Sequence, residues 1–266
     1  MLTYPERLQQ SAKQSGNILC LGLDPVPERV AKAMGADDVK AAEEFLERIL
    51  QALQEDGTLA GTLKPNLAYF EQYGPPGLAM LERLMERWSS KCLIICDAKR
   101  GDIGRSSLAY ARTFFDYYKA DAITASPWMG RDSLEPFLQY GPKQGTYVLL
   151  RTSNPGHSDL QASLWQTLAE QLHEWGDSSL GAVVGATSIA DLARALELIG
   201  PRPLLIPGVG AQGGSGREVL ACLKASGDPT LHRVNVSSGI LYAEANSEFV
   251  DGARRAAESF VSQLSF

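Results

Sequence analysis

One short stretch of the chain places acidic and basic side chains at a spacing that could do chemistry. It reads Asp97-Ala98-Lys99-Arg100-Gly101-Asp102 and ends an apolar run that begins at Cys92. If residues 92–99 form a strand, its side chains alternate in direction, so Asp97 and Lys99 share one face. Lys64 lies near the end of a second apolar run. The sequence therefore predicts a group of two cations and two anions: Lys64, Asp97, Lys99 and Asp102.

Alternating charges of this kind can remain ionised in a partly dry site. At about 4 Å and an effective dielectric near 20, one opposite pair is worth about 4 kcal/mol before desolvation. A carboxylate beside a lysine can face a substrate carboxylate, while the ammonium stabilises carbanion character and delivers a proton. The pattern thus favours the loss of CO2 from a substrate. The alternative is a structural ion-pair network at the mouth of a barrel.

A glycine-rich segment offers a second functional signal. Residues 208–216 contain five glycines and directly follow a strand-like run that ends at Pro207. Glycines let backbone N–H groups approach an anion closely, and Gln212 can donate a hydrogen bond to a phosphate oxygen. The segment predicts a phosphate site, with a flexible loop built from turn glycines as the alternative.

Other catalytic signatures are thin. The three histidines have no metal-ligand spacing, and His157 is either near a predicted loop cluster or an ordinary surface residue. Cys92 and Cys96 lie in an apolar run and are expected to be buried reduced thiols, which fits a reducing cytosol. There is no nucleophile elbow, no P-loop and no strand-linked G-x-G-x-x-G motif.

The charged residues require strands that end close together, and the chain offers eight candidates. Short apolar runs alternate with longer amphipathic ones, which indicates parallel strands joined by helices. The expected strands are Asn17–Asp24, Gly61–Asn66, Cys92–Lys99, Ala120–Ser126, Thr146–Thr152, Gly181–Ala186, Pro203–Pro207 and Arg233–Ser237. The expected helices are Val39–Glu55, Pro76–Ser89, Ser106–Tyr118, Ser133–Tyr140, Asp159–Trp175, Ser188–Leu198, Gly216–Ala225 and Glu248–Gln263, preceded by an extra helix at Tyr4–Gln14.

Eight such units predict an α/β fold, the closed (β/α)8 TIM barrel, with a doubly wound open sheet as the alternative. In such a barrel the active site lies where strands end and loops begin. Polar residues do gather at the expected ends, including Asp24, Lys64, Asp97 and residues 151–154. Charges on apolar strands are costly to bury without partners, so this gathering favours function.

Bulk properties narrow the class further. The 266 residues are 44% apolar and 21% charged, which is typical of a soluble globular protein, and we expect one domain over residues 1–266. A net charge of −6 argues against broad nucleic-acid binding. No apolar run is long enough for a membrane span, and residues 1–14 are too polar for a signal peptide.

Several motifs in order resemble one enzyme family. Residues 97–103 match the D-x-K-x-x-D signature of orotidine 5'-phosphate decarboxylases. Four more segments look like the bacterial subgroup with longer chains, and the resemblance runs from Gly22 to Tyr242: Leu63–Asn66, Arg151–Gly156, Val184–Thr187 and Ile206–Gly214. The resemblance implies a cytoplasmic (β/α)8 homodimer that needs neither metal nor organic cofactor. It also implies conversion of orotidine 5'-phosphate to UMP and CO2 in de novo pyrimidine biosynthesis.

The same resemblance implies roles for individual residues. Asp97 would face the substrate carboxylate, Lys99 would protonate C6, and Lys64 would contact the ribose. Asp102 would reach into the partner subunit's site, with Ile103 and Ser106 beside it. The remaining binding residues implied are Asp24 at the ribose hydroxyls, Ser153 at the pyrimidine and Gln212 at the phosphate.

One position departs from the family pattern. The family usually has an arginine in a Ser-Arg-Gly-like triplet after strand eight, and here Ser238 stands in that place. A serine hydroxyl can bind phosphate but lacks the bidentate charge of arginine. We therefore expect either weaker phosphate anchoring or a substitute cation, for which Arg217 is a candidate.

Two rival functions are open at this level. Magnesium-dependent sugar-phosphate decarboxylases or aldolases share the D-x-K-x-x-D motif, but they carry an acidic metal ligand where this chain has Lys64. A non-catalytic nucleotide-binding or regulatory barrel would keep the scaffold without the reaction. The complete set of four charged residues argues against it, whereas Ser238 leaves it open.

Overall fold

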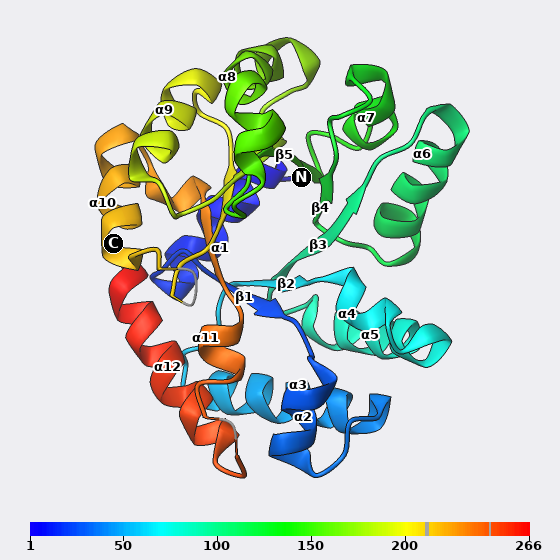
Figure 1. The fold of residues 1–266 in the computed structure, drawn as a ribbon, viewed down its shortest axis with the longest axis vertical. Helices are drawn as coiled ribbons and strands as arrows, with labels where there is room; N and C mark the ends of the chain where they lie inside the picture. Colours follow the sequence, from blue (N-terminus) through cyan, green and yellow to red (C-terminus); the bar gives the residue numbers. More distant parts are fainter. Residues whose placement is uncertain (211–212, 245) are drawn as a thin grey trace.

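The computed structural model describes residues 1–266 except 211, 212 and 245. Eight parallel strands form a closed barrel in chain order (Figure 1). They are β1 (Leu19–Leu23), β2 (Thr62–Pro65), β3 (Leu93–Arg100), β4 (Ala122–Ala125), β5 (Gly145–Arg151), β6 (Leu180–Val184), β7 (Leu204–Pro207) and β8 (Arg233–Val236). The eight predicted strands and the (β/α)8 fold are confirmed. The open-sheet alternative is wrong, because β8 pairs with β1, as in the register of Leu19 with Val234.

Helices surround the barrel. They are α1 (Tyr4–Ser15), α2 (Pro27–Met34), α3 (Val39–Glu55), α4 (Leu67–Glu71), α5 (Gly74–Trp88), α6 (Gly104–Ala111), α7 (Arg131–Leu138), α8 (His157–Trp175), α9 (Ile189–Ile199), α10 (Gly216–Ser226), α11 (Ser238–Leu241) and α12 (Phe249–Leu264). A π-helical turn, Arg112–Tyr117, continues α6, and a 3-10 turn covers Pro229–Leu231. Every helix expected from the sequence is present. The short helices α2, α4 and α11 were not predicted; α4 and α11, with five and four residues, are too brief to show a hydrophobic period.

Burial explains why these elements close into a barrel. The strands other than β3, β5 and β7 are buried along their whole length, so both faces of the sheet are covered. Helix α3 shows the complementary pattern, with Phe45, Ile49 and Leu53 buried at helical spacing. Its start is fixed by Asp38, whose carboxylate accepts a hydrogen bond from the Ala41 amide at 2.8 Å.

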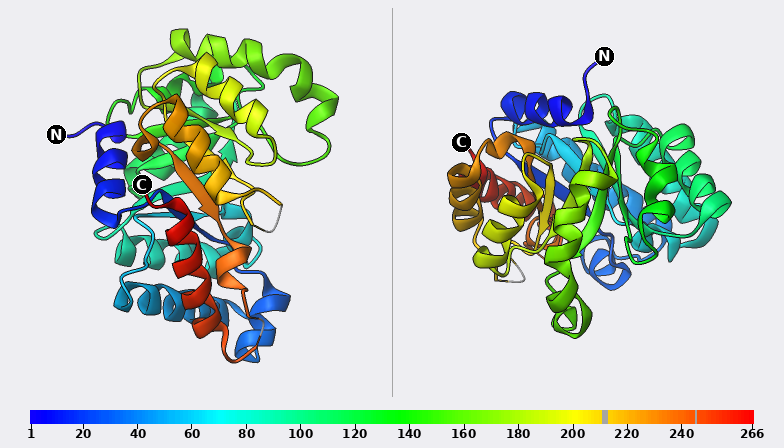
Figure 2. Two further views of the ribbon diagram at one scale, coloured as in Figure 1. Left: turned by 90° about the vertical axis from the view of Figure 1, so that its left-hand side faces the viewer. Right: turned by 90° about the horizontal axis from the view of Figure 1, so that it is seen from above.

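Helix α1 closes the end of the barrel at which the strands begin (Figure 2). Tyr4 and Leu8 are completely buried there, and the Tyr4 hydroxyl lies 3.0 Å from that of Tyr147 on β5. The buried guanidinium of Arg233 donates to the Leu8 carbonyl at 2.6 Å and to the Thr62 hydroxyl at 2.7 Å. The carboxyl ends of the strands therefore form the barrel's accessible mouth. No helix in the described part of the chain is long and apolar enough to cross a membrane.

Candidate active site

Three of the four predicted charged residues meet at the carboxyl ends of β2 and β3. Lys64 Nζ donates to Asp97 Oδ2 at 2.7 Å, and Lys99 Nζ donates to Asp97 Oδ1 at 2.5 Å. Thr124, on β4, donates from its hydroxyl to Asp97 Oδ1 at 2.9 Å. The carboxylate is thus held on both oxygens by groups from three neighbouring strands. Such a carboxylate has little freedom to turn away from a bound molecule.

The two lysines of this group differ in their exposure to solvent. The Lys64 side chain is 5% exposed and that of Asp97 is 11% exposed, whereas 48% of the Lys99 side chain is exposed. Lys64 therefore acts as a fixed buried counter-charge, because a buried ammonium needs a partner. Lys99 has its ammonium at the open side of the group, where it can also reach a ligand.

Electrostatics keep Asp97 and Lys64 in their charged forms. Burial alone would raise the pKa of Asp97, but the ammonium groups of Lys64 and Lys99 outweigh it and hold that pKa well below its ordinary value. Burial alone would likewise lower the pKa of Lys64, whereas the carboxylates of Asp97 and Asp24 raise it above the ordinary value. Across the neutral range the site therefore presents a carboxylate between ammonium groups.

The backbone at Lys99 leaves the regular strand conformation. Its φ is +49°, a left-handed value that is unfavourable for a residue with a Cβ atom. The register between β3 and β4 shifts between Cys96 and Arg100, and the Lys99 amide donates to the Thr124 hydroxyl at 2.9 Å. Simple strand alternation predicted that Asp97 and Lys99 share a face. The two side chains do meet, but through this irregularity rather than through an ideal pleat.

A cavity of about 360 Å³ opens beside the Lys64–Asp97 pair. Its walls come from the carboxyl ends of β1, β2, β3, β7 and β8 and from the segments that follow them. The lining residues are Asp24, Val26, Arg29, Lys64, Asn66, Tyr69, Asp97, Pro207, Gly208, Val209, Asn235, Ser237, Ser238, Gly239 and Tyr242. This volume, lined by both polar and charged groups, suits a small polar molecule.

Three polar atoms in that wall are buried and unpaired within the described residues: Asp24 Oδ1, Asn235 Oδ1 and Ser237 Oγ. Buried polar atoms without partners are rare and costly, so three around one cavity indicate groups that await a ligand. Gly22 makes room for them, since a Cβ atom there would lie 2.6 Å from Ser237 Cβ and 3.2 Å from Asn235 Oδ1.

Only some of the other predicted site residues line this cavity. Asp24 and Ser238 line the cavity with Lys64 and Asp97. Asp102 lies on the loop after β3, where its carboxylate accepts from the Ile103 amide at 2.7 Å. In the described part of a single chain, Asp102 forms no ion pair with Lys64 or Lys99.

The remaining predicted residues are outside the lining of the cavity or cannot be placed. Ile103 and Ser106 are exposed beside Asp102 and do not line it. Ser153 follows β5 and packs against Gly185, whose Cβ atom would lie 3.0 Å from that of Ser153. Gln212 falls outside the described residues. The candidate cation Arg217 is exposed on α10 and does not line the cavity.

Sequence reasoning missed several cavity residues. Asn235 and Ser237 lie at the end of β8, so the search for polar residues at strand ends could have included them. Arg29 and Tyr242 had no such signal, because they lie on or after short helices that were not predicted.

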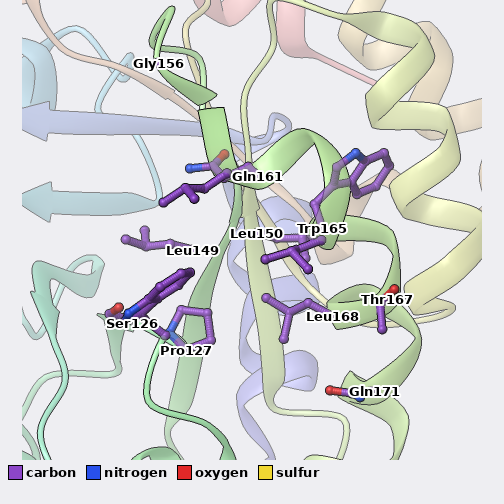
Figure 3. Close-up of a pocket in the computed structure, with 13 residues that line it drawn as sticks. Ser126, Pro127, Leu149, Leu150, Gly156, Gln161, Trp165, Thr167, Leu168 and Gln171 are labelled. Carbon is purple, nitrogen blue, oxygen red and sulfur yellow. The ribbon is translucent and has the colours of Figure 1, made fainter. Parts of the chain in front are cut away.

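An apolar groove of about 430 Å³ lies beside the mouth, between the segment after β4 and helix α8. Figure 3 shows Leu149 of β5 on the side of Pro127, and Leu150 on the side of Trp165 and Leu168 of α8. Gln161 ties the helix to the strand end by accepting a hydrogen bond from the Thr152 amide at 2.8 Å. The groove carries no charged lining residue and is distinct from the charged cavity.

The fold and the site together indicate a class of protein: (β/α)8 barrel enzymes that carry a lysine–aspartate–lysine group at the ends of the strands. Residues 17–250 match the model of the orotidine 5'-phosphate decarboxylase / HUMPS family. The chain is 39% identical to "Orotidine 5'-phosphate decarboxylase" of Delftia acidovorans, over 97% of this chain and 96% of that protein. The chain therefore belongs to the orotidine 5'-phosphate decarboxylase / HUMPS family. An orotidine 5'-phosphate decarboxylase, as the Delftia acidovorans relative is named, is a carboxy-lyase.

Solved structures agree with this assignment. A structure of Leishmania donovani OMP decarboxylase is similar at a TM-score of 0.82 and 33% identity, covering 98% of this chain and 97% of that one. A structure of Leishmania donovani UMP synthase is similar at a TM-score of 0.84 and 35% identity over 99% of this chain. This chain spans 56% of the length of that synthase.

Proposed function

We propose that this chain is a cytoplasmic, single-domain orotidine 5'-phosphate decarboxylase that makes UMP and CO2 without a metal or organic cofactor. The observation that carries the proposal is the Asp97 carboxylate, which is fixed between Lys64 and Lys99 beside a polar cavity. Family membership supports the choice of substrate. The magnesium-dependent alternative is disfavoured because the Lys64 ammonium occupies the end of β2, where those enzymes need an acidic ligand.

The reaction follows from the charges. The substrate carboxylate, placed next to Asp97, is repelled by it, and this repulsion ends as the C6–carboxylate bond breaks and CO2 leaves. The bonding electron pair stays on C6, where the Lys99 ammonium stabilises it and then transfers one proton. UMP is the product, and Lys99 regains a proton from water. Preorganised charges suit this reaction because the pyrimidine offers no electron sink for the pair.

The cavity accounts for the rest of the substrate. Asp24 has a buried oxygen without a partner in the described chain, which makes it a suitable acceptor for ribose hydroxyls. Lys64, at the end of the neighbouring strand β2, contacts the ribose, and Ser238 marks the phosphate end. Ser153 approaches the pyrimidine from the β5 side, and Gln212 contributes to the phosphate. Binding energy from the distant phosphate helps to hold the reacting carboxylate against Asp97.

We also propose a homodimer in which Asp102 completes the partner's site, with Ile103 and Ser106 beside it. An apolar surface next to Asp102 supports this: Ile103 is 61% exposed, Trp128 70% and Met129 43%. The loop after β3 packs against the loop after β4 at this point, because a Cβ atom on Gly101 would lie 3.7 Å from Met129 Cε. Large exposed apolar side chains in one place are typical of a protein interface.

The direct test is CO2 release from orotidine 5'-phosphate by the wild-type chain and by Lys99→Ala, with and without EDTA. We expect rapid, EDTA-insensitive release by the wild type and loss of nearly all activity in the variant. No release by the wild type would refute the function. Undiminished release by Lys99→Ala would refute the proton-donor role alone, and inhibition by EDTA would refute metal independence.

A further inference from the structure

Among the described residues, one positively charged side chain in the cavity wall has no anionic partner. Arg29, on α2, lines the cavity, and within the described residues it forms no ion pair. The other lining cation, Lys64, is already paired with Asp97 at 2.7 Å. An arginine remains charged at any physiological pH, so Arg29 gives this part of the wall a permanent free positive charge.

The Arg29 guanidinium is held in place by an aromatic ring. Its Cζ atom lies 4.1 Å from the centroid of the Tyr242 ring, a close cation–π contact. The Tyr242 hydroxyl donates to the Asp24 carbonyl at 2.9 Å and accepts from the Val26 amide at 2.7 Å. These bonds connect the segment after β8 to the segment that leads into α2. Stacking on a fixed ring leaves the guanidinium edge available for a ligand.

Arg29 lies at the end of the cavity that is formed by the residues after β8. Tyr242 follows α11, and the residues that precede this helix and begin it, Ser237, Ser238 and Gly239, form the wall at the end of β8. None of these three is charged. A phosphate monoester at this end would bring close to two negative charges. Without Arg29, the described lining residues would offer two carboxylates and one ammonium that is already paired.

From this arrangement we infer that Arg29 binds the 5'-phosphate of the substrate and supplies the cation that Ser238 does not. The inference rests on the proposed function. The guanidinium can donate two parallel hydrogen bonds to phosphate oxygens while its face remains on Tyr242. It also replaces our earlier candidate, Arg217, which does not line the cavity. Arg29 is therefore a substrate-binding residue contributed by the first βα connection.

The test compares UMP with uridine, which differ only in the phosphate. Binding of both is measured by calorimetry for the wild type, Arg29→Ala, Arg29→Met, Arg29→Lys and Lys32→Ala. A charge-assisted hydrogen bond lost from a bound phosphate corresponds to a loss of about 10- to 100-fold. We expect that loss of UMP affinity in Arg29→Ala and Arg29→Met, with uridine binding unchanged. Arg29→Lys, which keeps the charge but loses the two parallel hydrogen bonds, should fall between the wild type and Arg29→Ala.

Two of the variants separate charge from structure. Arg29→Met keeps an unbranched stem over Tyr242 but removes the charge, so a purely structural role predicts nearly normal UMP binding. Lys32→Ala removes a cation from the exposed side of the same helix and should bind UMP as the wild type does. In turnover, the Arg29 effect should fall mainly on the KM for orotidine 5'-phosphate.

A compensating substitution adds a second readout. Arg29→Ala combined with Ser238→Arg should recover at least part of the lost UMP affinity, because it returns a cation to the same end of the cavity. Wild-type UMP affinity in both Arg29→Ala and Arg29→Met would overturn the inference while leaving the proposed function intact. A wild-type chain that neither releases CO2 nor binds UMP would refute the proposed function, and this inference with it.

Discussion

Lys64 and Asp97 extend from neighbouring strands of the barrel and meet at 2.7 Å, with both side chains almost closed to solvent. Each charge offsets much of the cost of burying the other, because an unpaired buried charge is strongly destabilising. The same pair that carries the proposed chemistry is therefore part of the stability of the barrel mouth.

Removal of one member of this pair should destabilise the fold. We expect Asp97→Ala to lower the free energy of unfolding by about 3–5 kcal/mol, since it removes the hydrogen-bonded counter-charge of the buried Lys64 ammonium. The double variant Asp97→Ala with Lys64→Met should regain much of that stability and remain inactive. Urea unfolding measures both, with Glu43→Ala as the control, because the Glu43–Arg83 pair is more exposed and worth at most about 1 kcal/mol. Equal losses at Asp97 and Glu43 would contradict this view.

Thr124 should position Asp97 and Lys99 without touching the substrate. Its hydroxyl donates to the Asp97 carboxylate and accepts from the Lys99 amide, both at 2.9 Å. Thr124→Val keeps the shape but loses both bonds, so we expect kcat to fall about 3- to 10-fold with little change in KM. Thr124→Ser should preserve kcat. Steady-state decarboxylation kinetics test this, and a normal kcat in Thr124→Val would remove the positioning role.

The proposed exchange of Asp102 between subunits can be tested by mixing two inactive chains. Asp102→Ala lacks the donated carboxylate, and Lys99→Ala lacks the proton donor. After unfolding and refolding together in equal amounts, half of the dimers are mixed, and each mixed dimer has one intact site. About a quarter of wild-type activity should therefore return. If Asp102 acted within its own chain, every site in the mixture would stay defective and no activity would reappear.

His232 should make the fold sensitive to mild acid. Burial, and to a lesser extent the Arg233 guanidinium, lower its pKa from 6.5 to about 4, while Asp228 opposes the shift. Between pH 6.5 and 4 the unfolded chain binds a proton that the folded chain does not, so stability falls as the pH falls. The loss should be on the order of 3 kcal/mol across this window.

Replacement of His232 by asparagine should flatten that part of the stability profile. The asparagine side-chain oxygen can stand in for Nδ1, which accepts from the Leu204 amide at 3.2 Å. Denaturant unfolding at pH 7, 5.5 and 4 provides the comparison. If the variant lost as much stability in acid as the wild type does, groups other than His232 would be responsible for that loss.

Much of the fold could be predicted because the relevant signals are local. Each buried strand has its own apolar run, and long helices such as α3 show a clear period, so even their ends were predicted closely. Strand ends bearing Lys64 and Asp97 identified the site for the same reason. The meeting of these two residues then follows from the parallel pairing of β2 with β3.

The parts that were missed depend on contacts far apart in the chain. Arg29 enters the cavity wall because α2 is seated against Tyr242, more than two hundred residues later. The left-handed backbone of Lys99 depends on a hydroxyl from β4. Asp102 has a clear sequence motif, yet within one chain it reaches neither lysine. No pattern within a short window encodes such relationships.

The contact between α1 and Arg233 also has a consequence for biosynthesis. Arg233 donates to the Leu8 carbonyl across 225 positions, so the contacts that hold the first helix are complete only when the last strand exists. At roughly 5–20 residues per second, the nascent chain waits about 10–45 s between making these two segments. During that time the apolar side of α1 has no barrel floor to cover. Ribosome-bound fragments that stop before β8 should accordingly be sensitive to protease at their amino-terminal end and be clients of chaperones.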